Sequence, residues 1–367
     1  MRLSTLKVIR CPAYFNSQLC LSQLILSKNY PVIYLDNNQT EINEAILKCK
    51  KCKSEYPVIF SMAIIMPDAK DYLSKNYNHI IKLATEEKLT LSDQMLRYLH
   101  KTGADIISAR TPTFIYDTSR TLSSYLCTHY DDILDSPGHS GALISGIKKY
   151  YKNDLYSVIS KKFNSKISKS RKSLDVGCNV GRMSYELSLG SQIVFGIDVS
   201  LYSAITARRI LTGLPTRLKN YYLFREGIIQ TKKPMRNLVR KNVEILIASG
   251  NQLPFANSYF DIVNSTNIID TVSNPLTMIH ENLRVLKTQG EFILSVPFAW
   301  EKNPFRTSET GENREKISKK SLSKALKNHL RIKSEADFIP WVIREYDRKY
   351  TIYLCYLMVA EKIRNEY

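Results

Sequence analysis

The sequence lacks a hydrophobic run long enough to cross a membrane. Its two longest apolar stretches, PVIFSMAIIM (57–66) and TIYLCYLMVA (351–360), each cover about half of the roughly 20 residues that a spanning helix needs. Near the start, Lys7 and Arg10 stand where a signal peptide would have an uninterrupted apolar segment. No internal repeat or low-complexity tract is evident. We therefore expect a soluble, cytoplasmic protein without a membrane span.

Acidic residues are scarce relative to basic ones. The chain has 34 Asp and Glu against 53 Lys and Arg, a formal net charge of +19. Such an excess is typical of proteins that bind nucleic acid, an acidic membrane surface or anionic ligands. It is equally typical of a lysine-rich proteome whose proteins keep their lysines solvated, so charge alone leaves the partner open.

A disulfide framework is also missing. The seven cysteines are odd in number and scattered through a chain of 367 residues, which is too large to depend on disulfides. This usage fits a reducing compartment. The cysteines are Cys11, Cys20, Cys49, Cys52, Cys127, Cys178 and Cys355.

The first 165 residues divide into two parts. Residues 1–68 contain the strand-like runs YPVIYLD (30–36) and YPVIFSMAIIMP (56–67), flanked by Pro and Asn turns, and predict a small β-rich module. Residues 69–165 are mostly helical in pattern and predict a connector.

Residues 166–367 alternate between strand and helix patterns. We expect strands near 173–176, 192–197, 243–248, 260–265 and 290–296, and helices near 180–189, 201–212 and 275–287. Asn274 and Pro275 suit the start of the last helix, and Gly290 its end. This order predicts an α/β fold with a doubly wound, mostly parallel sheet. A tail helix (319–330) and two strands (331–338 and 350–359) predict an antiparallel pair at the sheet edge.

The segment SLDVGCNVGRMSYEL (173–187) places a carboxylate, Asp175, at the end of a strand and before a glycine turn. The dinucleotide fingerprint G-x-G-x-x-G is absent, because Asn179 and Arg182 stand at its second and third glycines. A pyrophosphate beside Asp175 would bring two negative groups together. The turn instead favours a ligand that carries an ammonium, such as S-adenosylmethionine, which has no phosphate.

A second carboxylate follows the next strand. In QIVFGIDVS (192–200), Asp198 lies 21 residues after Gly177, the spacing at which an acid can accept both ribose hydroxyls. The alternative is that Asp198 only caps the next helix, although Ser200 is the more natural cap.

Four segments in order resemble motifs of class I S-adenosylmethionine-dependent methyltransferases. LDVGCNVG (174–181) resembles L-D-x-G-C-G-x-G, and GIDVS (196–200) resembles the second motif. ASGNQLPFANSYFDIV (248–263) is similar to G-D-A-x-x-L-P-F-x-x-x-x-F-D-x-V, and RVLKTQGEFILSVP (284–297) to R-V-L-K-P-G-G-x-x-x-x-x-x-P. The resemblance, which covers 172–300, implies a Rossmann-like fold and methyl transfer from S-adenosylmethionine. The implied cofactor-binding residues are Asp175, Gly177, Cys178, Asn179, Gly181, Asp198, Val199, Ser249, Gly250 and Asn251.

The chain departs from these motifs at the adenine position. The family usually has Asp where Ser249 stands, and a hydroxyl accepts a hydrogen bond without the charge. We expect either a weaker cofactor affinity or a substitute acceptor, Asn251. Asn179 replaces a usual glycine, which an ordinary or left-handed backbone tolerates.

Residues 46–68, ILKCKKCKSEYPVIFSMAIIMPD, resemble the small zinc-ribbon activator protein of transfer-RNA and release-factor methyltransferases. That family opens with C-P-x-C, whereas here Tyr14 replaces the second cysteine and Cys20 is out of register. A tetrahedral zinc needs four ligands, and the resemblance leaves three, Cys11, Cys49 and Cys52. We expect a degenerate, zinc-ribbon-like module without metal; a retained zinc with Cys20 recruited is the alternative.

The C-terminal part resembles the mercaptohistidine N-methyltransferases of ovothiol biosynthesis. The similar segments are NIIDTVSNPLTMI (267–279), SVPFAW (295–300) and PWVIREYDRKYTIYL (340–354). The loop after Trp300 differs from that family's, so its substrate is not implied here.

The acceptor site has no recognisable catalytic dyad. Methyl transfer requires mainly alignment and a dry pocket, and a base only if the acceptor must lose a proton. The catalytic residues are therefore unknown from sequence. His139, in PGHSG, is a candidate lid residue or base, and the alternative is a loop histidine with neither role. The acceptor-site candidates, which lie in loops after the strands, are Asn267, Asp270, Trp300, Arg344 and Arg348. The two arginines can clamp a carboxylate.

The insertion 214–241 has eight basic residues and one acid, Glu226, with YYLF between them. Basic and aromatic residues together can bind single-stranded nucleic acid, but no recognised module is present, and a lid is the simpler interpretation. We expect a methyltransferase that acts on a small molecule. The alternatives are a transfer-RNA or protein methyltransferase with a built-in activator module, and a non-catalytic RNA-binding or scaffold protein.

Overall fold

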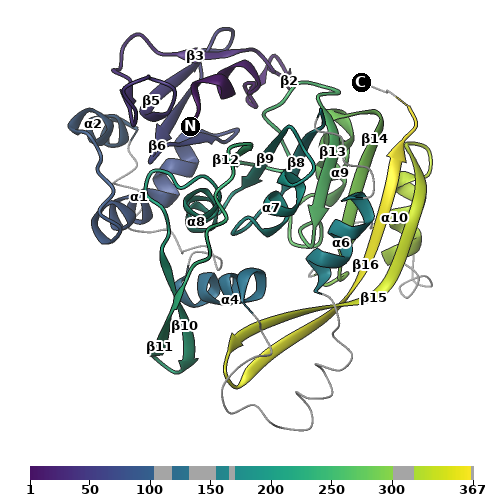
Figure 1. Ribbon diagram of the computed structural model, residues 1–367. Coiled ribbons are helices and arrows are strands. Elements are labelled where there is room, and N and C mark those ends of the chain that lie inside the picture. The colour runs from purple at the N-terminus through teal and green to yellow at the C-terminus, as the bar shows by residue number, and fades with distance from the viewer. Residues whose placement is uncertain (103–117, 132–153, 165–169, 301–317, 365–367) are drawn as a thin grey trace, which may run out of the picture.

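A sheet of 12 strands runs through the computed structural model, which describes residues 1–102, 118–131, 154–164, 170–300 and 318–364 (Figure 1). Eleven of the strands follow one path. In spatial order they are β15 (Leu330–Tyr346), β16 (Lys349–Lys362), β14 (Leu286–Val296), β13 (Phe260–Thr266), β8 (Lys172–Val176), β9 (Ile193–Asp198), β12 (Val243–Ala248), β7 (Met62–Ile65), β6 (Glu55–Ile59), β5 (Ile42–Cys49) and β3 (Leu24–Leu26). The remaining strand, β4 (Ile33–Tyr34), pairs with β5.

The predicted doubly wound sheet is confirmed. β14, β13, β8, β9 and β12 are parallel neighbours, and β16 lies antiparallel against β14. β15 and β16 form the expected antiparallel edge pair. Both strands are longer than their sequence pattern indicated, because they continue past the sheet as a twisted ribbon (Figure 1).

Helices α7 (Arg182–Ser188), α8 (Leu201–Leu211) and α9 (Pro275–Val285) connect the parallel strands. The Oγ of Ser200 caps α8 by accepting from the N–H of Ser203, and the side chain of Asn274 caps α9. Gly290 does not end α9 as expected. Leu286 already has an extended backbone and pairs with Phe260, so β14 begins there and Gly290 lies inside it.

Two hydrophobic cores cover the two faces of the sheet. Along β12, Ile245 and Ile247 belong to one core and Leu246 and Ala248 to the other, as the alternation of strand side chains requires. The first core also holds α7 and α8 and the helices of the connector, α1 (Ala69–Glu86), α2 (Asp93–Lys101), α4 (Ser119–Tyr130) and α6 (Leu155–Asn164). The second holds α9, α10 (Ser318–Leu326) and the start of the chain.

The N-terminal module (residues 1–68) joins the parallel sheet directly. Its β7 pairs with β12 in parallel, Ile64 opposite Ile247. Beside this junction, the buried Arg208 donates to Glu244 at 2.6 Å and lies 3.5 Å from Glu41 of the module. The remaining elements of the module are the 3-10 helix Leu3–Lys7 and the short strands β1 (Tyr14–Phe15) and β2 (Gln18–Leu19).

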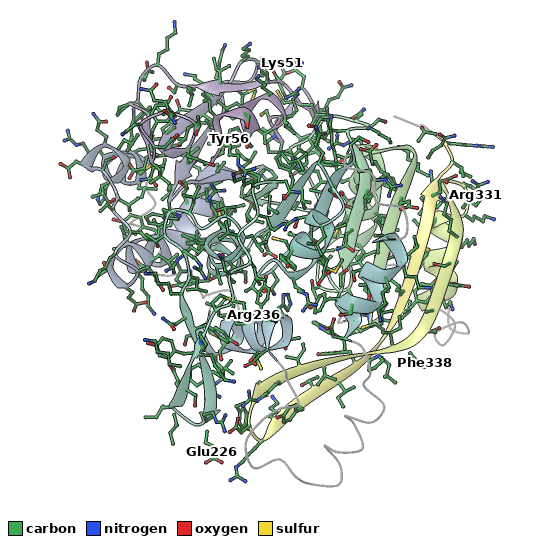
Figure 2. All side chains as sticks on the ribbon, in the orientation of Figure 1. Lys51, Tyr56, Glu226, Arg236, Arg331 and Phe338 are labelled. Carbon is green, nitrogen blue, oxygen red and sulfur yellow. The ribbon has the colours of Figure 1, made fainter. Side chains whose placement is uncertain are left out.

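The insertion 214–241 contains an antiparallel hairpin, β10 (Asn220–Glu226) and β11 (Ile229–Pro234). Its tip meets the turn between β15 and β16, where Arg225 pairs with Asp347 and Glu226 with Arg348. Both hairpins extend away from the sheet on the side of α4 (Figure 1, and Glu226 in Figure 2).

Candidate cofactor and acceptor site

Asp175 is a buried carboxylate near the carboxyl end of β8, with 1% of its surface exposed. Its two oxygens accept hydrogen bonds from Ser184 Oγ at 2.7 Å and Asn264 Nδ2 at 2.8 Å. No ion pair among the described residues gives it a cation. Burial therefore raises the pKa of Asp175 to about 6, although both hydrogen bonds oppose the shift. A cationic ligand would relieve this unfavourable charge.

The glycine turn links this carboxylate to the next strand. The N–H groups of Gly177 and Cys178 both donate to the Ile197 carbonyl. Gly177 has φ +74°, and a Cβ there would lie 2.2 Å from Ile268, so only glycine fits. Asn179 takes the left-handed conformation at φ 46°, and its N–H donates to Asp198 Oδ2 at 2.8 Å.

Asp198 follows at the end of β9, the strand next to β8. Its Oδ1 accepts from the N–H of Ser200 at 2.9 Å, while Ser200 itself caps α8. The capping role that stood as the alternative for Asp198 therefore belongs to Ser200. Asp175 and Asp198 thus lie at the same edge of neighbouring parallel strands.

A cavity of about 480 Å³ opens at this edge. Of the expected cofactor residues, Gly177, Asn179, Asp198, Val199, Ser249, Gly250 and Asn251 line it. Met66, which precedes α1, and Tyr72, which lies in α1, line the cavity as well. The Tyr72 hydroxyl donates to the Val199 carbonyl at 2.8 Å. Gly181 does not line the cavity; it is the N-cap residue of α7, and a Cβ there would lie 2.7 Å from Leu211 and 3.2 Å from Ala207.

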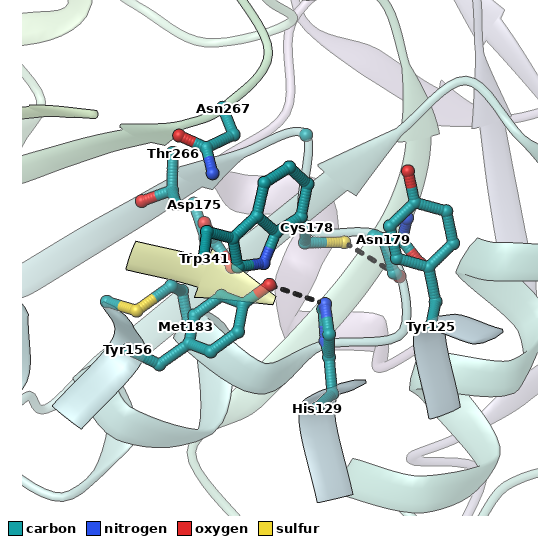
Figure 3. A pocket seen from close by; sticks show the side chains of 11 residues that line it. Tyr125, His129, Tyr156, Asp175, Cys178, Asn179, Met183, Thr266, Asn267 and Trp341 are labelled. Carbon is teal, nitrogen blue, oxygen red and sulfur yellow. Dashed lines mark hydrogen bonds between the residues drawn. The ribbon is translucent and has the colours of Figure 1, made fainter. Parts of the chain in front are cut away.

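A smaller recess of about 50 Å³, lined in part by Asp175, adjoins the cavity; Figure 3 shows the side chains around it. The two spaces share the lining residues Tyr125, Gly177, Asn179, Asn267 and Trp341. The recess is also lined by Cys178, whose thiol pKa is raised by burial. It is closed by residues that sequence reasoning missed, His129 and Tyr156 among them.

Several buried polar atoms around the recess have no hydrogen-bond partner among the described residues. They are His129 Nδ1, Asn179 Oδ1 and Asn267 Nδ2. The other ring nitrogen of His129 contacts the Tyr156 hydroxyl at 2.7 Å (Figure 3). Burial lowers the pKa of His129 to about 3, so the ring is neutral. Because buried polar groups are normally satisfied, these atoms indicate a place for a polar ligand.

The ends of β13 and β14 and the β15–β16 hairpin form the opposite side of the cavity. Asn267 and Asp270, two of the acceptor-site candidates from the sequence, line it. Asp270 Oδ2 accepts from the N–H of Ala299 at 2.9 Å, whereas its Oδ1 has no partner among the described residues. Burial raises the pKa of Asp270. Trp341 and Tyr353 of the hairpin also line this side.

The other acceptor candidates are not brought to the cavity. Arg344 is buried between Asp347 and the Cys127 sulfur, and Arg348 is exposed at the hairpin tip. The expected arginine clamp is therefore not formed. Trp300 packs beside Phe298, and neither lines the cavity. His139 lies outside the described residues.

Near the adenine position predicted from the sequence, the Ser249 hydroxyl accepts from the N–H of Asn251 at 3.2 Å. Asn251 Oδ1 is buried and has no partner among the described residues. A free acceptor therefore exists at Asn251, the residue considered as a substitute for the missing Asp.

Four cysteines of the N-terminal module cluster. The Sγ atoms of Cys11, Cys20, Cys49 and Cys52 all lie within 4.8 Å of one another. The Cys11–Cys52 and Cys20–Cys49 sulfur distances are 3.4 and 3.6 Å, and four thiolates around zinc lie roughly 3.8 Å apart. The expectation that a fourth ligand is missing is wrong. The residues fit a tetrahedral metal site with Cys20 as the fourth ligand.

A comparison with protein families matches the part of the chain that contains Asp175 and Asp198. The profile of a family described as a methyltransferase domain matches residues 174–294. An uncharacterised protein of Methanocaldococcus jannaschii is 30% identical over 70 residues, which are 19% of this chain and 34% of that protein, so the match spans about a third of that relative.

Several solved structures are similar in part. A SAM-dependent methyltransferase of Methanosarcina mazei is 22% identical, with 58% of this chain and all of that chain covered (100%) and a TM-score of 0.37. A chain from the complex between the Haloferax volcanii Trm112 methyltransferase activator and its candidate methyltransferase is 15% identical, with 60% and 93% covered and a TM-score of 0.39.

Among the described residues, none of the helices is both long and apolar enough to span a membrane. The family match begins in β8, ends in β14 and contains both carboxylates of the cavity edge. Residues 174–294 of this chain therefore match a methyltransferase domain.

Proposed function

We propose that S-adenosylmethionine binds across the cavity and the recess, between Asp175 and Asp198. The observation that carries this proposal is the recess itself, in which a buried carboxylate without a cation lies beside unpartnered donors and an acceptor. The amino-acid end of the ligand is a zwitterion of matching charge. Its ammonium would lie near Asp175, and the ribose hydroxyls near Asp198.

His129 has a defined part in this proposal. If the Tyr156 hydroxyl donates to Nε2, the ring proton is on Nδ1, which then donates to the ligand's carboxylate. Asn267 Nδ2 is a second free donor on the same wall. On the adenine side, Ser249, Gly250 and Asn251 line the cavity, with Tyr72 supporting the Val199 backbone.

The bound ligand supplies a methyl group on a sulfonium. The chain's own contribution is to orient the acceptor and to exclude water. Asp270 suits a further task, since it lines the cavity, its Oδ1 has no partner among the described residues, and its raised pKa makes it a better base than an exposed Asp. We propose that Asp270 orients the acceptor and accepts the proton that it loses.

A small molecule is the acceptor class that we propose, because the β15–β16 hairpin covers this end of the cavity with Trp341, Ile343 and Tyr353. Without the arginine clamp, an anionic acceptor is not favoured over a neutral one. The mercaptohistidine substrate of the resembled family is not carried over to this chain, because the loop after Trp300 differs from that family's. The runner-up, an RNA or protein methyltransferase, is favoured by one observation, the basic cavity described in the next subsection.

The N-terminal module (1–68), the helical connector (69–165) and the catalytic part (166–367) would then act as one unit. We propose that the four cysteines hold a structural zinc, whose role is to fix the β5–β6 end of the module. The module continues through β7 into Met66 and Tyr72 at the cofactor cavity. None of the seven cysteines, all of which lie in the described residues, forms a disulfide.

Isothermal titration with S-adenosylmethionine tests the cofactor proposal. Two hydrogen bonds to a charged group contribute about 1.5–3 kcal/mol each, so Asp198→Ala should weaken binding by at least about 100-fold. Asp71→Ala, which removes an exposed acid on α1, is the matched control and should bind like the wild type. Unchanged affinity in both Asp175→Ala and Asp198→Ala, with folding verified by circular dichroism, would overturn the placement.

A further inference from the structure

A second cavity lies on the other side of α4. It has a volume of about 610 Å³ and is bounded by α4, α8 and the β10–β11 hairpin. Within α4, Leu122, Ser123 and Leu126 line this cavity, whereas Tyr125 and His129 line the recess of the cofactor site. One helix therefore separates the two spaces, and the methyl-transfer site does not account for the second one.

The second cavity carries unpaired positive charge. Arg217, Lys219 and Lys232 line it, and none of them has an ion pair or side-chain hydrogen bond within the ranges that the structure describes. By contrast, Arg209 at the same cavity is paired with Glu87 at 2.6 Å. Glu87 is the single acid of the lining. Three cations thus face this space without a carboxylate of their own.

Aromatic side chains stand between these cations. Tyr222 is 52% exposed, and it lies directly across the hairpin from Lys232. Phe224, opposite Gln230 in the same ladder, also lines the cavity. An exposed tyrosine ring does not contribute buried apolar surface to folding. In single-stranded nucleic-acid sites, such a ring stacks on a base while neighbouring cations neutralise the phosphates. An acidic peptide would use the cations but leave this platform unused.

We propose that this cavity binds single-stranded nucleic acid, with a base stacked on Tyr222 and phosphates held by Arg217, Lys219 and Lys232. The inference goes beyond the proposed function, because it names a partner and does not depend on cofactor binding. It would place a nucleic-acid chain one helix away from the methyl-transfer cavity.

Fluorescence anisotropy with labelled 12-residue RNA and DNA oligonucleotides of the same sequence tests the proposal, and the two arms show which nucleic acid is preferred. With three phosphate contacts, log K should fall with log salt at a slope of about −2 for single strands. Tyr222→Ala should weaken binding about 5- to 150-fold, whereas Tyr222→Phe should retain it.

The charge variant is Arg217→Gln/Lys219→Gln/Lys232→Gln, which should bring the salt slope close to zero. The matched control, Lys324→Gln/Lys327→Gln/Arg331→Gln, removes the same charge at the far edge of the sheet (Arg331 in Figure 2) and should leave binding unchanged. Equal losses in the two triple variants, full competition by a polyglutamate peptide, or no effect of Tyr222→Ala would each overturn the proposal. Titration with S-adenosylmethionine reports the cofactor site separately.

Discussion

Replacing Asp175 by asparagine should stabilise the ligand-free protein at neutral pH. The pKa of this carboxyl is about 6 in the folded chain against an ordinary value of 3.8. A raised pKa means that the folded state holds the proton more tightly than the unfolded chain, so stability falls as pH rises from about 4 to 6. The difference between the two pKa values corresponds to about 3 kcal/mol of folding free energy. The wild type loses this stability at neutral pH, and the variant keeps it.

Asparagine can preserve the local contacts. Its oxygen can accept from Asn264 Nδ2, and its amide can donate to Ser184 Oγ, because that hydroxyl is free to rotate. The change therefore removes the charge while keeping both side-chain hydrogen bonds, and the stability gain should appear at pH 7 and vanish below about pH 4.

Thermal unfolding followed by circular dichroism between pH 4 and 8 measures this gain. A difference of about 3 kcal/mol corresponds to roughly 6 °C in Tm for a large domain. Added S-adenosylmethionine should reverse the order, because a ligand that binds only the wild type stabilises only the wild type. A variant less stable than the wild type at pH 8 would show that hydrogen bonds already compensate the charge of Asp175.

Three further changes probe other parts of the structure. Asp270→Asn should lower kcat/KM about 100- to 10,000-fold for an acceptor that loses a proton, without changing cofactor affinity; a cofactor affinity that fell equally would contradict a role on the acceptor side. Metal analysis should find about one zinc per chain, and Cys20→Ser should lower that content and the Tm; wild-type protein purified without metal would refute the site. Arg208→Ala leaves Glu244 buried without its cation and should cost about 3–5 kcal/mol in urea unfolding, so a cost below 1 kcal/mol would show that the pair is not needed at the module junction.

The sheet and its two carboxylates could be predicted because both depend on local patterns. Alternating strand and helix segments predict a parallel sheet. Acids that end neighbouring strands must then share one edge, and Asp175 and Asp198 do. Asn267 and Asp270 follow from the same rule, since each comes after β13.

The residues that sequence reasoning missed or misplaced depend on contacts between distant segments. Cys20 is out of register in sequence, but the N–H of Cys20 donates to the Ala13 carbonyl, and this turn carries its sulfur to Cys49. His129 comes from a helix of the connector, where no motif marks it. Arg344 was expected to clamp a ligand, but its guanidinium pairs with Asp347, three residues further along the hairpin. The sequence pattern did not reveal this pair.

A crystal structure with S-adenosylhomocysteine tests the central claim most directly. The account predicts that the ribose hydroxyls lie within hydrogen-bond distance of Asp198 and that the amino-acid end enters the recess between Asp175 and His129. A ligand bound elsewhere, or a recess that remains empty while the cavity is occupied, would contradict it.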